Sequence, residues 1–392
     1  MRFTASRAAL RPAIAAAATA ASRDNKALDI LRTLLIDATA GEVRITGSDM
    51  VHSCTAAAAA TIDRPGAACV DAHIFDRFVG GLPAGADVAV SIDGGVMLVT
   101  SGRTHVRLSI LPADAFPLME MGADGQSIAV SAADLSAILA VAAPAAESPT
   151  GPHWFLAGVH LEIAGDALTA VATDRRRLHT ATAKLSAATD PLNITVGAES
   201  IAKIAKLIKS AGEVVIRASG AMVEVDTGGA IYRSKLIDEK FQDGWRRILG
   251  IKHRYTLRVD RPALVEIIDR VMLTLDTERP SAIISPSEGF VEFICHNPAN
   301  GAVVRDMLSA EVDGETCAIS VNALHLAEAI KAISGETITI SVAPVQTNPP
   351  GQILVSGGTP DTYAAVSPYG AMTAHDLAAL DAAKSRAIAE SA

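Results

Sequence analysis

Residues 194–241 read ITVGAESIAKIAKLIKSAGEVVIRASGAMVEVDTGGAIYRSKLIDEKF, and this stretch predicts the unit from which the chain is built. A short strand, Ile194–Val196, ends at Gly197, where an amphipathic helix over Ala198–Ala211 begins. Three strands follow, and turn residues separate them. They are Glu213–Ala218, Met222–Asp226 and Ala230–Leu236. The order strand, helix and three strands is written βαβββ below.

The predicted helix carries its apolar residues on one face. Four of them recur at the spacing i, i+3, i+4 and i+7, which is typical of a helix packed on a sheet. They are Ile201, Ile204, Ala205 and Ile208. Three lysines, Lys203, Lys206 and Lys209, are expected on the opposite side. We therefore expect a helix that covers a sheet and presents positive charge.

The start of this helix recurs along the chain in two interleaved series, with a period of about 125 residues. In each member a strand ends at a capping residue, and an apolar anchor follows four residues later. In the first series the cap and anchor pairs are Ser6 and Leu10, Ser131 and Leu135, and Asp260 and Leu264. In the second series they are Asp71 and Phe75, Gly197 and Ile201, and Asn322 and Leu326. Six helices are thus predicted.

The repeat predicts an α+β fold of three similar domains, each made of two βαβββ units. At 392 residues the chain is long for a single core, which agrees with several domains. The predicted domains are 1–122, 127–250 and 254–370. Residues 371–392 form an alanine-rich, charged tail, for which an extra helix or a disordered tail is expected rather than a docking segment.

The charge pattern favours a local basic surface on an acidic protein. The formal net charge is −9, which argues against a surface that is generally coated by nucleic acid. The charged residues of the predicted outward helix faces are nevertheless mainly basic. They include Arg7, Arg11, Arg77, Lys203, Lys206, Lys209, Arg270 and Lys331. Phosphate contacts carry no sequence information, so such a surface would hold a duplex without fixing its register.

The remaining composition indicates a cytoplasmic protein. The four cysteines lie far apart without a CxxC pair, and we expect small buried side chains in a reducing compartment. They are Cys54, Cys69, Cys295 and Cys317. The alanine-rich N-terminus fits the first strand and helix of the repeat better than a signal peptide. No stretch approaches the length of a transmembrane helix.

Several motifs in combination resemble the bacterial DNA polymerase III β subunit, the sliding clamp. They are Met1–Thr4, Ser101–Arg103 with Leu108–Pro112, Val171–Asp174 with Arg177-Leu178, and Ser234–Asp238 with Phe241 and Arg246-Arg247. The resemblance extends from Met1 to about Gly370. It implies the DNA clamp fold, in which two chains close head to tail into a homodimeric ring with helices lining the hole.

The resemblance also implies a function. Members of this family are processivity factors that encircle duplex DNA without sequence preference and catalyse no reaction, so no enzymatic activity, catalytic residue, cofactor or metal is expected. The implied partners are DNA polymerase III and other polymerases, which bind through short clamp-binding peptides. This chain has no GxxxxGK[ST] loop with which to bind ATP. Opening of the ring is therefore expected to need a separate, ATP-driven clamp loader.

By this resemblance, partner peptides bind in an apolar pocket with a polar rim. The matching positions are Leu156, Thr173, Arg175, Arg176, Arg177, Leu178, Gln242, Arg247, Ile248, Ala364, Val366, Pro368 and Tyr369. The chain departs from the family where Arg175 replaces a small residue and Gln242 replaces a proline. The ending also differs, because Val366–Gly370 stands in place of the usual one and the chain continues.

The resemblance further implies a dimer interface and a DNA-facing surface. The matching interface positions are Arg103, His105, Val106, Leu108, Met272 and Leu273. The acidic cluster expected after Asn297-Pro298 is missing, because Ala299–Val304 stands there. The DNA-facing candidates from the family pattern are Arg23, Lys26, Trp154 and Phe155, to which the helix pattern adds Lys203, Lys206 and Lys209.

Two alternatives remain open from the sequence. The chain is either the main clamp or a diverged clamp paralogue that serves a specialised polymerase or an accessory role. The βαβββ unit also builds metalloenzymes, for which His160 and Glu162 are the one strand-placed pair of suitable ligands. Gly47–Asp49 resembles Ala172–Asp174 in its placement, which marks a repeat position rather than an active site.

Overall fold

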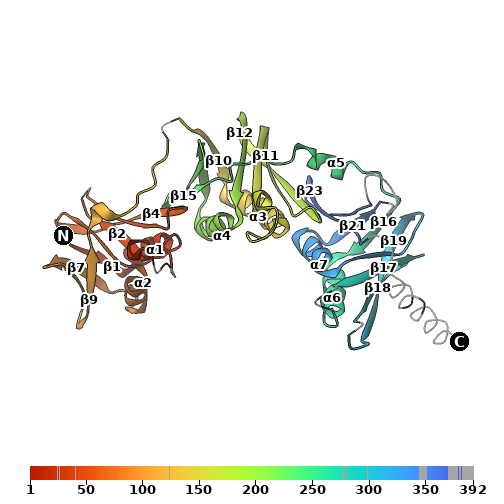
Figure 1. The fold of residues 1–392 in the computed structure, drawn as a ribbon, viewed down its shortest axis with the longest axis horizontal. Helices are drawn as coiled ribbons and strands as arrows, with labels where there is room; N and C mark the ends of the chain where they lie inside the picture. The colour runs from red at the N-terminus through yellow and green to blue at the C-terminus, as the bar shows by residue number, and fades with distance from the viewer. Residues whose placement is uncertain are drawn as a thin grey trace. The chain divides into compact units, whose positions relative to one another are not determined.

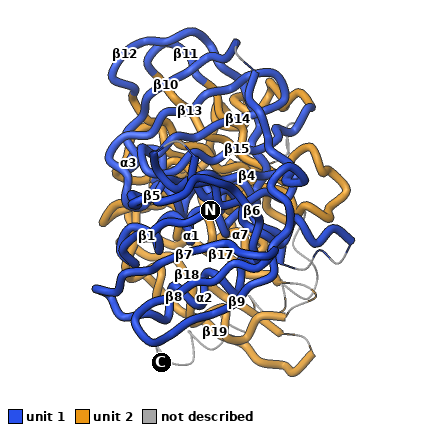
Figure 2. The backbone as a smooth tube through the Cα atoms, turned by 90° about the vertical axis from the view of Figure 1, so that its left-hand side faces the viewer, with its two compact units in different colours: residues 1–136, 163–166, 185–238 blue, residues 137–162, 167–184, 239–392 orange. Residues whose placement is uncertain are grey.

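The computed structural model describes residues 1–23, 25, 27–39, 41–122, 124–276, 278, 280–297, 299–343, 351–369, 378 and 381. The chain divides into two compact units, which Figure 2 shows in different colours. Unit 1 comprises residues 1–136, 163–166 and 185–238, and unit 2 comprises residues 137–162, 167–184 and 239–392. The division into three domains stays a prediction, and the predicted tail lies outside the described residues except for Ala378 and Asp381.

Unit 1 is built on a 13-stranded antiparallel sheet with the order β10-β13-β14-β15-β4-β3-β2-β6-β9-β8-β7-β1-β5. Its elements are β1 (Arg2–Ser6), α1 (Arg7–Ala18), β2 (Thr33–Asp37), β3 (Val43–Ser48), β4 (His52–Ala58), β5 (Thr61–Arg64), β6 (Ala67–Asp71), α2 (Ala72–Gly81), β7 (Asp87–Asp93), β8 (Val96–Ser101), β9 (Thr104–Leu111), β10 (Gln126–Ser131), α4 (Ala198–Leu207), β13 (Glu213–Ser219), β14 (Met222–Asp226) and β15 (Ala230–Lys235). Strand β15 pairs with β4, so the first and second predicted domains share this sheet.

Three elements contribute residues to both units: α3 (Ala132–Ala142), β11 (Gly158–Thr173) and β12 (Arg177–Gly197). A second sheet has the order β11-β12-β23-β22-β21-β16-β19-β18-β17-β20. The other elements of unit 2 are η4 (Trp154–Leu156), η6 (Asp243–Trp245), α5 (Arg246–Leu249), β16 (Tyr255–Asp260), α6 (Arg261–Met272), β17 (Ser281–Ser287), β18 (Phe290–His296), β19 (Val303–Gly314), β20 (Ile319–Asn322), α7 (Ala323–Ala332), β21 (Thr337–Val342), β22 (Ile353–Ser356) and β23 (Thr362–Val366).

All six predicted helices are present and begin where the capping pattern places them (Figure 1). The side chains of Ser6, Asp71, Asp260 and Asn322 accept hydrogen bonds from backbone N–H groups of the first helical turn. Gly197 caps α4 without a side chain. The six apolar anchors are all buried, which confirms the predicted core face of each helix. Local capping and one apolar stripe therefore account for every helix start in the repeat.

Helix α4 differs from the prediction in the position of one lysine. Ile201, Ile204 and Ile208 are buried as expected, and Lys206 and Lys209 are exposed. The Lys203 side chain is only 14% exposed and binds the carboxylates of Asp49 and Glu199. The prediction that all three lysines lie on the outward face is therefore wrong for Lys203, because acidic partners hold it at the boundary of the core.

Candidate functional site

A cavity of about 320 Å³ lies in unit 2. Three segments that are far apart in the sequence line it: the loop between β11 and β12, the segment with η6 and α5, and residues at β22 and β23. The lining residues are Thr173, Arg175, Arg176, Arg177, Leu178, Gln242, Gly244, Trp245, Arg247, Ile248, Gln352, Ala365, Val366 and Ser367. We call this cavity the unit 2 pocket.

The loop from residue 173 to residue 177 is held by its own hydrogen bonds. The Thr173 hydroxyl accepts from the backbone N–H of Arg175 at 3.0 Å and donates to the carbonyl of Arg177 at 2.6 Å. One carboxylate oxygen of Asp174 accepts from the backbone N–H groups of Arg176 and Arg177, each at 2.9 Å. Arg175 has a φ of 71°, a left-handed conformation that is uncommon for a residue with a side chain.

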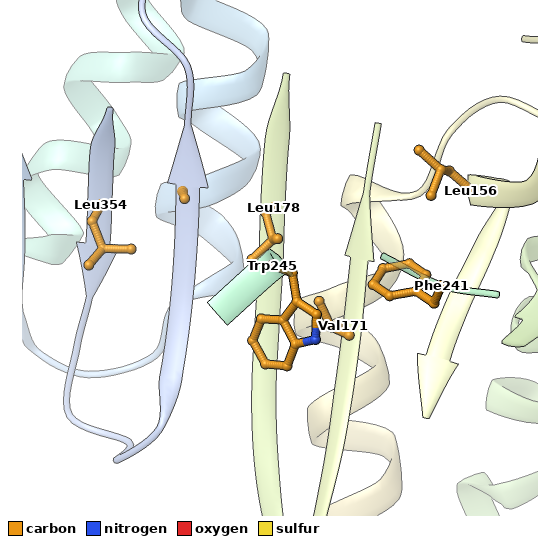
Figure 3. Close-up of a cluster of buried hydrophobic side chains, with 7 residues drawn as sticks. Leu156, Val171, Leu178, Phe241, Trp245 and Leu354 are labelled. Carbon is orange, nitrogen blue, oxygen red and sulfur yellow. The ribbon is translucent and has the colours of Figure 1, made fainter. Parts of the chain in front are cut away.

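An apolar cluster forms the floor of the pocket. Its buried members are Leu156, Val171, Leu178, Phe241, Trp245, Leu354 and Ala365. Figure 3 shows Trp245 beside Val171 and Leu178. Ile248 packs against this cluster and also lines the pocket. The pocket thus combines apolar walls with polar groups from the loop, which suits a ligand that brings one or two apolar side chains.

Arginine side chains line the pocket or lie next to it, and they differ in how their charge is balanced. Arg177 binds Asp174 at 3.0 Å through its Nε and forms an ion pair with Glu328 of α7. Arg246, next to the pocket, binds Glu162 at 2.9 Å and lies over the Trp245 ring at 4.2 Å. Arg175, Arg176 and Arg247 are exposed. The rim is therefore basic.

The strand-placed pair His160 and Glu162, on which the metalloenzyme alternative depends, has other partners in the structure. The His160 ring stacks on Phe241, with ring centroids 4.6 Å apart, and burial lowers the pKa of this imidazole. Glu162 binds Arg246. A stacked imidazole and a carboxylate held by a guanidinium give no support to the metalloenzyme alternative.

Nine of the residues expected at a partner pocket line the unit 2 pocket. They are Thr173, Arg175, Arg176, Arg177, Leu178, Gln242, Arg247, Ile248 and Val366. Leu156 lies in the cluster beneath it, and Ala364 is buried in β23. Pro368 pairs with Val321, and the Tyr369 N–H donates to the carbonyl of Ser320.

Five lining residues were not predicted: Gly244, Trp245, Gln352, Ala365 and Ser367. Trp245 could have been predicted from the sequence, because it is one of only two tryptophans and directly precedes Arg246-Arg247, which belongs to the family motif. Ala365 and Ser367 adjoin predicted Val366. Gln352 carried no signal, since only the folded chain brings its segment to Ile248, whose carbonyl accepts a hydrogen bond from the Gln352 amide.

Unit 1 holds a charged cluster at the equivalent loop between β3 and β4. Asp49, His52 and Glu199 lie close enough together to share a cation, and the Lys203 ammonium lies 3.4 Å from Asp49, 3.0 Å from His52 and 2.9 Å from Glu199. Burial raises the pKa of Asp49, but hydrogen bonds from His52 and Val51 outweigh it and lower this pKa to about 2. The ammonium already supplies the positive charge that the carboxylates need.

The candidate DNA-facing residues have varied surroundings. Arg23 is exposed and lines a second cavity, of about 300 Å³, in unit 1. Lys206 and Lys209 are exposed on and after α4, whereas Lys203 is held as described. Trp154 is 54% exposed, and Phe155 packs against the floor of the unit 2 pocket. Lys26 lies outside the described residues.

The candidate interface residues lie beside two open strand edges. Within the described residues, Thr104–Ser109 of β9 pair only with β8, and Val303–Ser309 of β19 pair only with β18. Arg103 and His105 are exposed, Val106 and Met272 are half-buried, and Leu273 is 83% exposed. Leu108 is buried in unit 1, so its side chain is not available to a partner.

Three of the four cysteines are buried as expected. Cys54, Cys69 and Cys295 are buried and Cys317 is half-buried, all as free thiols. Among the described helices, none combines the length and the apolar character that crossing a membrane requires.

Comparisons with known proteins agree with this fold. The family model of the DNA polymerase III beta subunit N-terminal domain matches residues 1–120, and that of the central domain matches residues 135–243. Together these two models cover more than half of the chain. A beta sliding clamp of Caulobacter vibrioides is 29% identical over 86% of this chain and 91% of its own length.

Other relatives give the same result. The beta sliding clamp of Escherichia coli K12 is 25% identical over 81% of this chain and 88% of its own length. The solved structure of Caulobacter crescentus pol III beta is 26% identical and has a TM-score of 0.86, covering 94% of this chain and 100% of its own. The Pseudomonas aeruginosa DNA polymerase III subunit beta has the same fold, with a TM-score of 0.88, 24% identity and the same coverage. This chain belongs to the family of bacterial DNA polymerase III beta subunits, the sliding clamps.

Proposed function

We propose that this sliding clamp, a processivity factor without enzymatic activity, encircles duplex DNA as a homodimer and holds polymerases through short peptides that bind the unit 2 pocket. The observation that carries this proposal is the pocket itself, with its apolar floor and its basic rim. Its volume suits one or two anchoring side chains of a peptide rather than a flat protein surface.

The open edges of β9 and β19 support a head-to-tail dimer. Unpaired strand edges are prone to uncontrolled association unless a specific partner covers them. Leu273, the residue that follows α6, is 83% exposed and is therefore available to such a contact. Two unlike surfaces on one chain, each used once per contact, can close a ring when the rotation between copies is right.

The exposed cations Arg23, Lys206 and Lys209 in unit 1 support a contact with DNA phosphates. Such contacts bind any sequence and therefore permit sliding. An ATP-driven clamp loader would open the ring, since the chain carries no nucleotide-binding loop of its own. From a role in DNA replication we infer that the protein acts at the bacterial chromosome, in the cytoplasm.

A specialised paralogue is the second candidate. Arg175 and Gln242 both line the pocket, at positions where the family resemblance calls for a small residue and a proline. A changed rim alters which peptides bind and leaves the clamp fold intact, so the two candidates differ in partners rather than in mechanism.

The test compares retention on circular and linear DNA after loading by the cognate loader with ATP. A ring stays on nicked circular DNA at high salt and leaves DNA once a restriction enzyme opens the circle. Equal loss from both forms would contradict encirclement. The variant Leu273→Asp should be monomeric by light scattering and should lose retention, because it places a charge in the proposed contact.

Peptide binding serves as the control that the Leu273→Asp variant is folded, so that loss of retention can be assigned to loss of the ring. Because Leu273 lies outside the unit 2 pocket, the Leu273→Asp monomer should still bind a clamp-binding peptide with unchanged affinity. A dimer that persists in this variant would show that the exposed leucine does not belong to the interface.

A further inference from the structure

We propose that the unit 2 pocket selects peptides in which acidic residues flank the apolar anchor. This inference rests on the proposed function, because it names the chemistry of the peptides that the pocket would take. The observation behind this inference is the distribution of charged side chains around the pocket.

Four arginines line the pocket, and no aspartate or glutamate is among the lining residues. They are Arg175, Arg176, Arg177 and Arg247. Arg177 has its charge balanced inside the protein, because Asp174 and Glu328 both bind its guanidinium. Its role is therefore to hold the loop, and its side chain is not free to take up a ligand carboxylate.

The other three arginines keep their charge for a ligand. In the part of the chain that the structure describes, Arg175, Arg176 and Arg247 form no ion pair with a carboxylate, and all three are exposed. Arg175 donates a hydrogen bond to Nε2 of His153 at 3.0 Å. A guanidinium can only donate, so the His153 nitrogen accepts, and this contact orients the Arg175 charge without neutralising it.

The net charge of the protein is opposite in sign to the charge of the three arginines at the pocket. A net charge of −9 disfavours the approach of acidic peptides to the protein as a whole, whereas the three arginines add local positive charge at the pocket. An exposed ion pair contributes up to about 1 kcal/mol, so two new pairs would give on the order of a tenfold preference. Salt should weaken this preference, since exposed charges are screened within about 10 Å at 0.1 M.

The chain provides its own matched variant for a test. The loop between β3 and β4 has Met50 and Val51 where the pocket loop has Arg175 and Arg176, each 125 residues further along. Met50 has a φ of 73°, against 71° for Arg175. The double variant Arg175→Met/Arg176→Val therefore removes both charges with side chains that this backbone already accepts.

The experiment measures the binding of two short fluorescent peptides to the full chain. They share a Leu-Phe anchor and differ only in their flanks, which are Asp and Glu in one and Asn and Gln in the other. We expect the acidic peptide to bind about tenfold tighter at about 0.05 M salt and the preference to shrink strongly at about 0.5 M. In Arg175→Met/Arg176→Val, which keeps only Arg247 of the three unpaired arginines, the preference should fall to about threefold or less, through loss of affinity for the acidic peptide.

A control variant adds Met50→Arg/Val51→Arg to the double variant, which restores the net charge on the equivalent loop of unit 1. The preference should stay reduced, because the restored charges do not lie at the pocket. Its return, or equal binding of both peptides to the unchanged chain, would overturn the inference while leaving the peptide pocket intact. Failure of both peptides to bind would instead refute the proposed peptide site.

Discussion

Two loops of the molecule share one backbone design and serve different ends. In unit 1, the Ser48 hydroxyl accepts from the N–H of Met50 at 3.3 Å, and Asp49 accepts from the N–H groups of Val51 and His52 at 2.9 and 2.6 Å. The loop 173–177 in unit 2 repeats this pattern at positions 125 residues further along, including the left-handed third residue. The duplication has thus kept the hydrogen bonds that define the loop.

Each loop also reaches a helix at an equivalent position. Lys203 lies six residues after the cap of α4 and binds Asp49, whereas Glu328 lies six residues after the cap of α7 and binds Arg177. In unit 1 the helix supplies the positive charge and the loop the negative one, whereas in unit 2 the helix supplies the negative charge and the loop the positive one. The contact in unit 1 is the more buried one, since Glu328 is 46% exposed and Lys203 only 14%.

The comparison shows how one repeat produces both a structural contact and a binding site. The backbone hydrogen bonds are the same, so the difference comes from the side chains at the exposed loop positions and from the neighbouring segments. In unit 2 those segments, at η6 and β23, leave the pocket beside the loop. Three predictions test this comparison.

The largest expected difference between the two regions is in the response to acid of the strands that follow the loops. His179 on β12 is equivalent to Cys54 on β4, and both are fully buried. Burial lowers the pKa of His179 to about 4, despite a hydrogen bond to the carbonyl of Val141, and burial raises the pKa of the Cys54 thiol to about 12. Only the unit 2 position therefore titrates in acid.

The direction of this effect follows from proton linkage. The unfolded chain, with a histidine pKa near 6.5, binds the proton more tightly than the folded unit does. The stability contributed by neutral His179 is thus complete above pH 6.5 and is lost as the pH falls towards 4, by about 3 kcal/mol in total. Lowered pKa values of His160, His253 and His325 add to the loss with the same sign.

Tryptophan fluorescence measures this loss, because both tryptophans, Trp154 and Trp245, lie in unit 2. Urea unfolding at several pH values should show a shallower pH dependence for His179→Cys, which copies the unit 1 residue, than for the unchanged chain. A pH dependence that is identical in the two proteins would show that His179 is not the group that titrates.

The second effect, in unit 1, is the loss of the Lys203 contact. Lys203→Met leaves Asp49, which is 20% exposed, with His52 as its remaining side-chain partner, and should destabilise unit 1 by about 2 kcal/mol. Hydrogen exchange of amides in residues 43–58 would measure it. Lys206→Met, at an exposed position of the same helix, should cost less than about 0.5 kcal/mol. Similar effects of both variants would mean that the cluster does not stabilise the loop.

The smallest effect is the loss of the equivalent contact in unit 2. Glu328→Gln should cost only about 1 kcal/mol, because Glu328 is half exposed and Arg177 keeps Asp174 as a partner. Urea unfolding followed by tryptophan fluorescence would report it. A cost equal to that of Lys203→Met would contradict the view that unit 1 uses this loop for stability and unit 2 for binding.

The candidate site was only partly predictable from the sequence. The family resemblance named nine of the residues that line the pocket, yet the position of Leu108 in the core and the burial of Lys203 were not foreseen. A periodic pattern separates apolar from polar faces, but a long polar side chain at the boundary of two faces follows its partner. Glu199, one partner of Lys203, lies one helical turn earlier, but the other partner, Asp49, lies 154 residues away in the chain, beyond the reach of any local pattern.

What the sequence by itself determined is the repeat: where each helix begins, which residue caps it and which residue anchors it. Those features depend on hydrogen bonds and contacts within one helical turn, so they are written into a few adjacent residues. Only the tertiary structure decided which charges meet and where a pocket opens, as in the pairing of Arg177 with Glu328 and the meeting of Ile248 with Gln352. These contacts join distant segments, and their energies depend on burial and geometry that exist only in the folded chain.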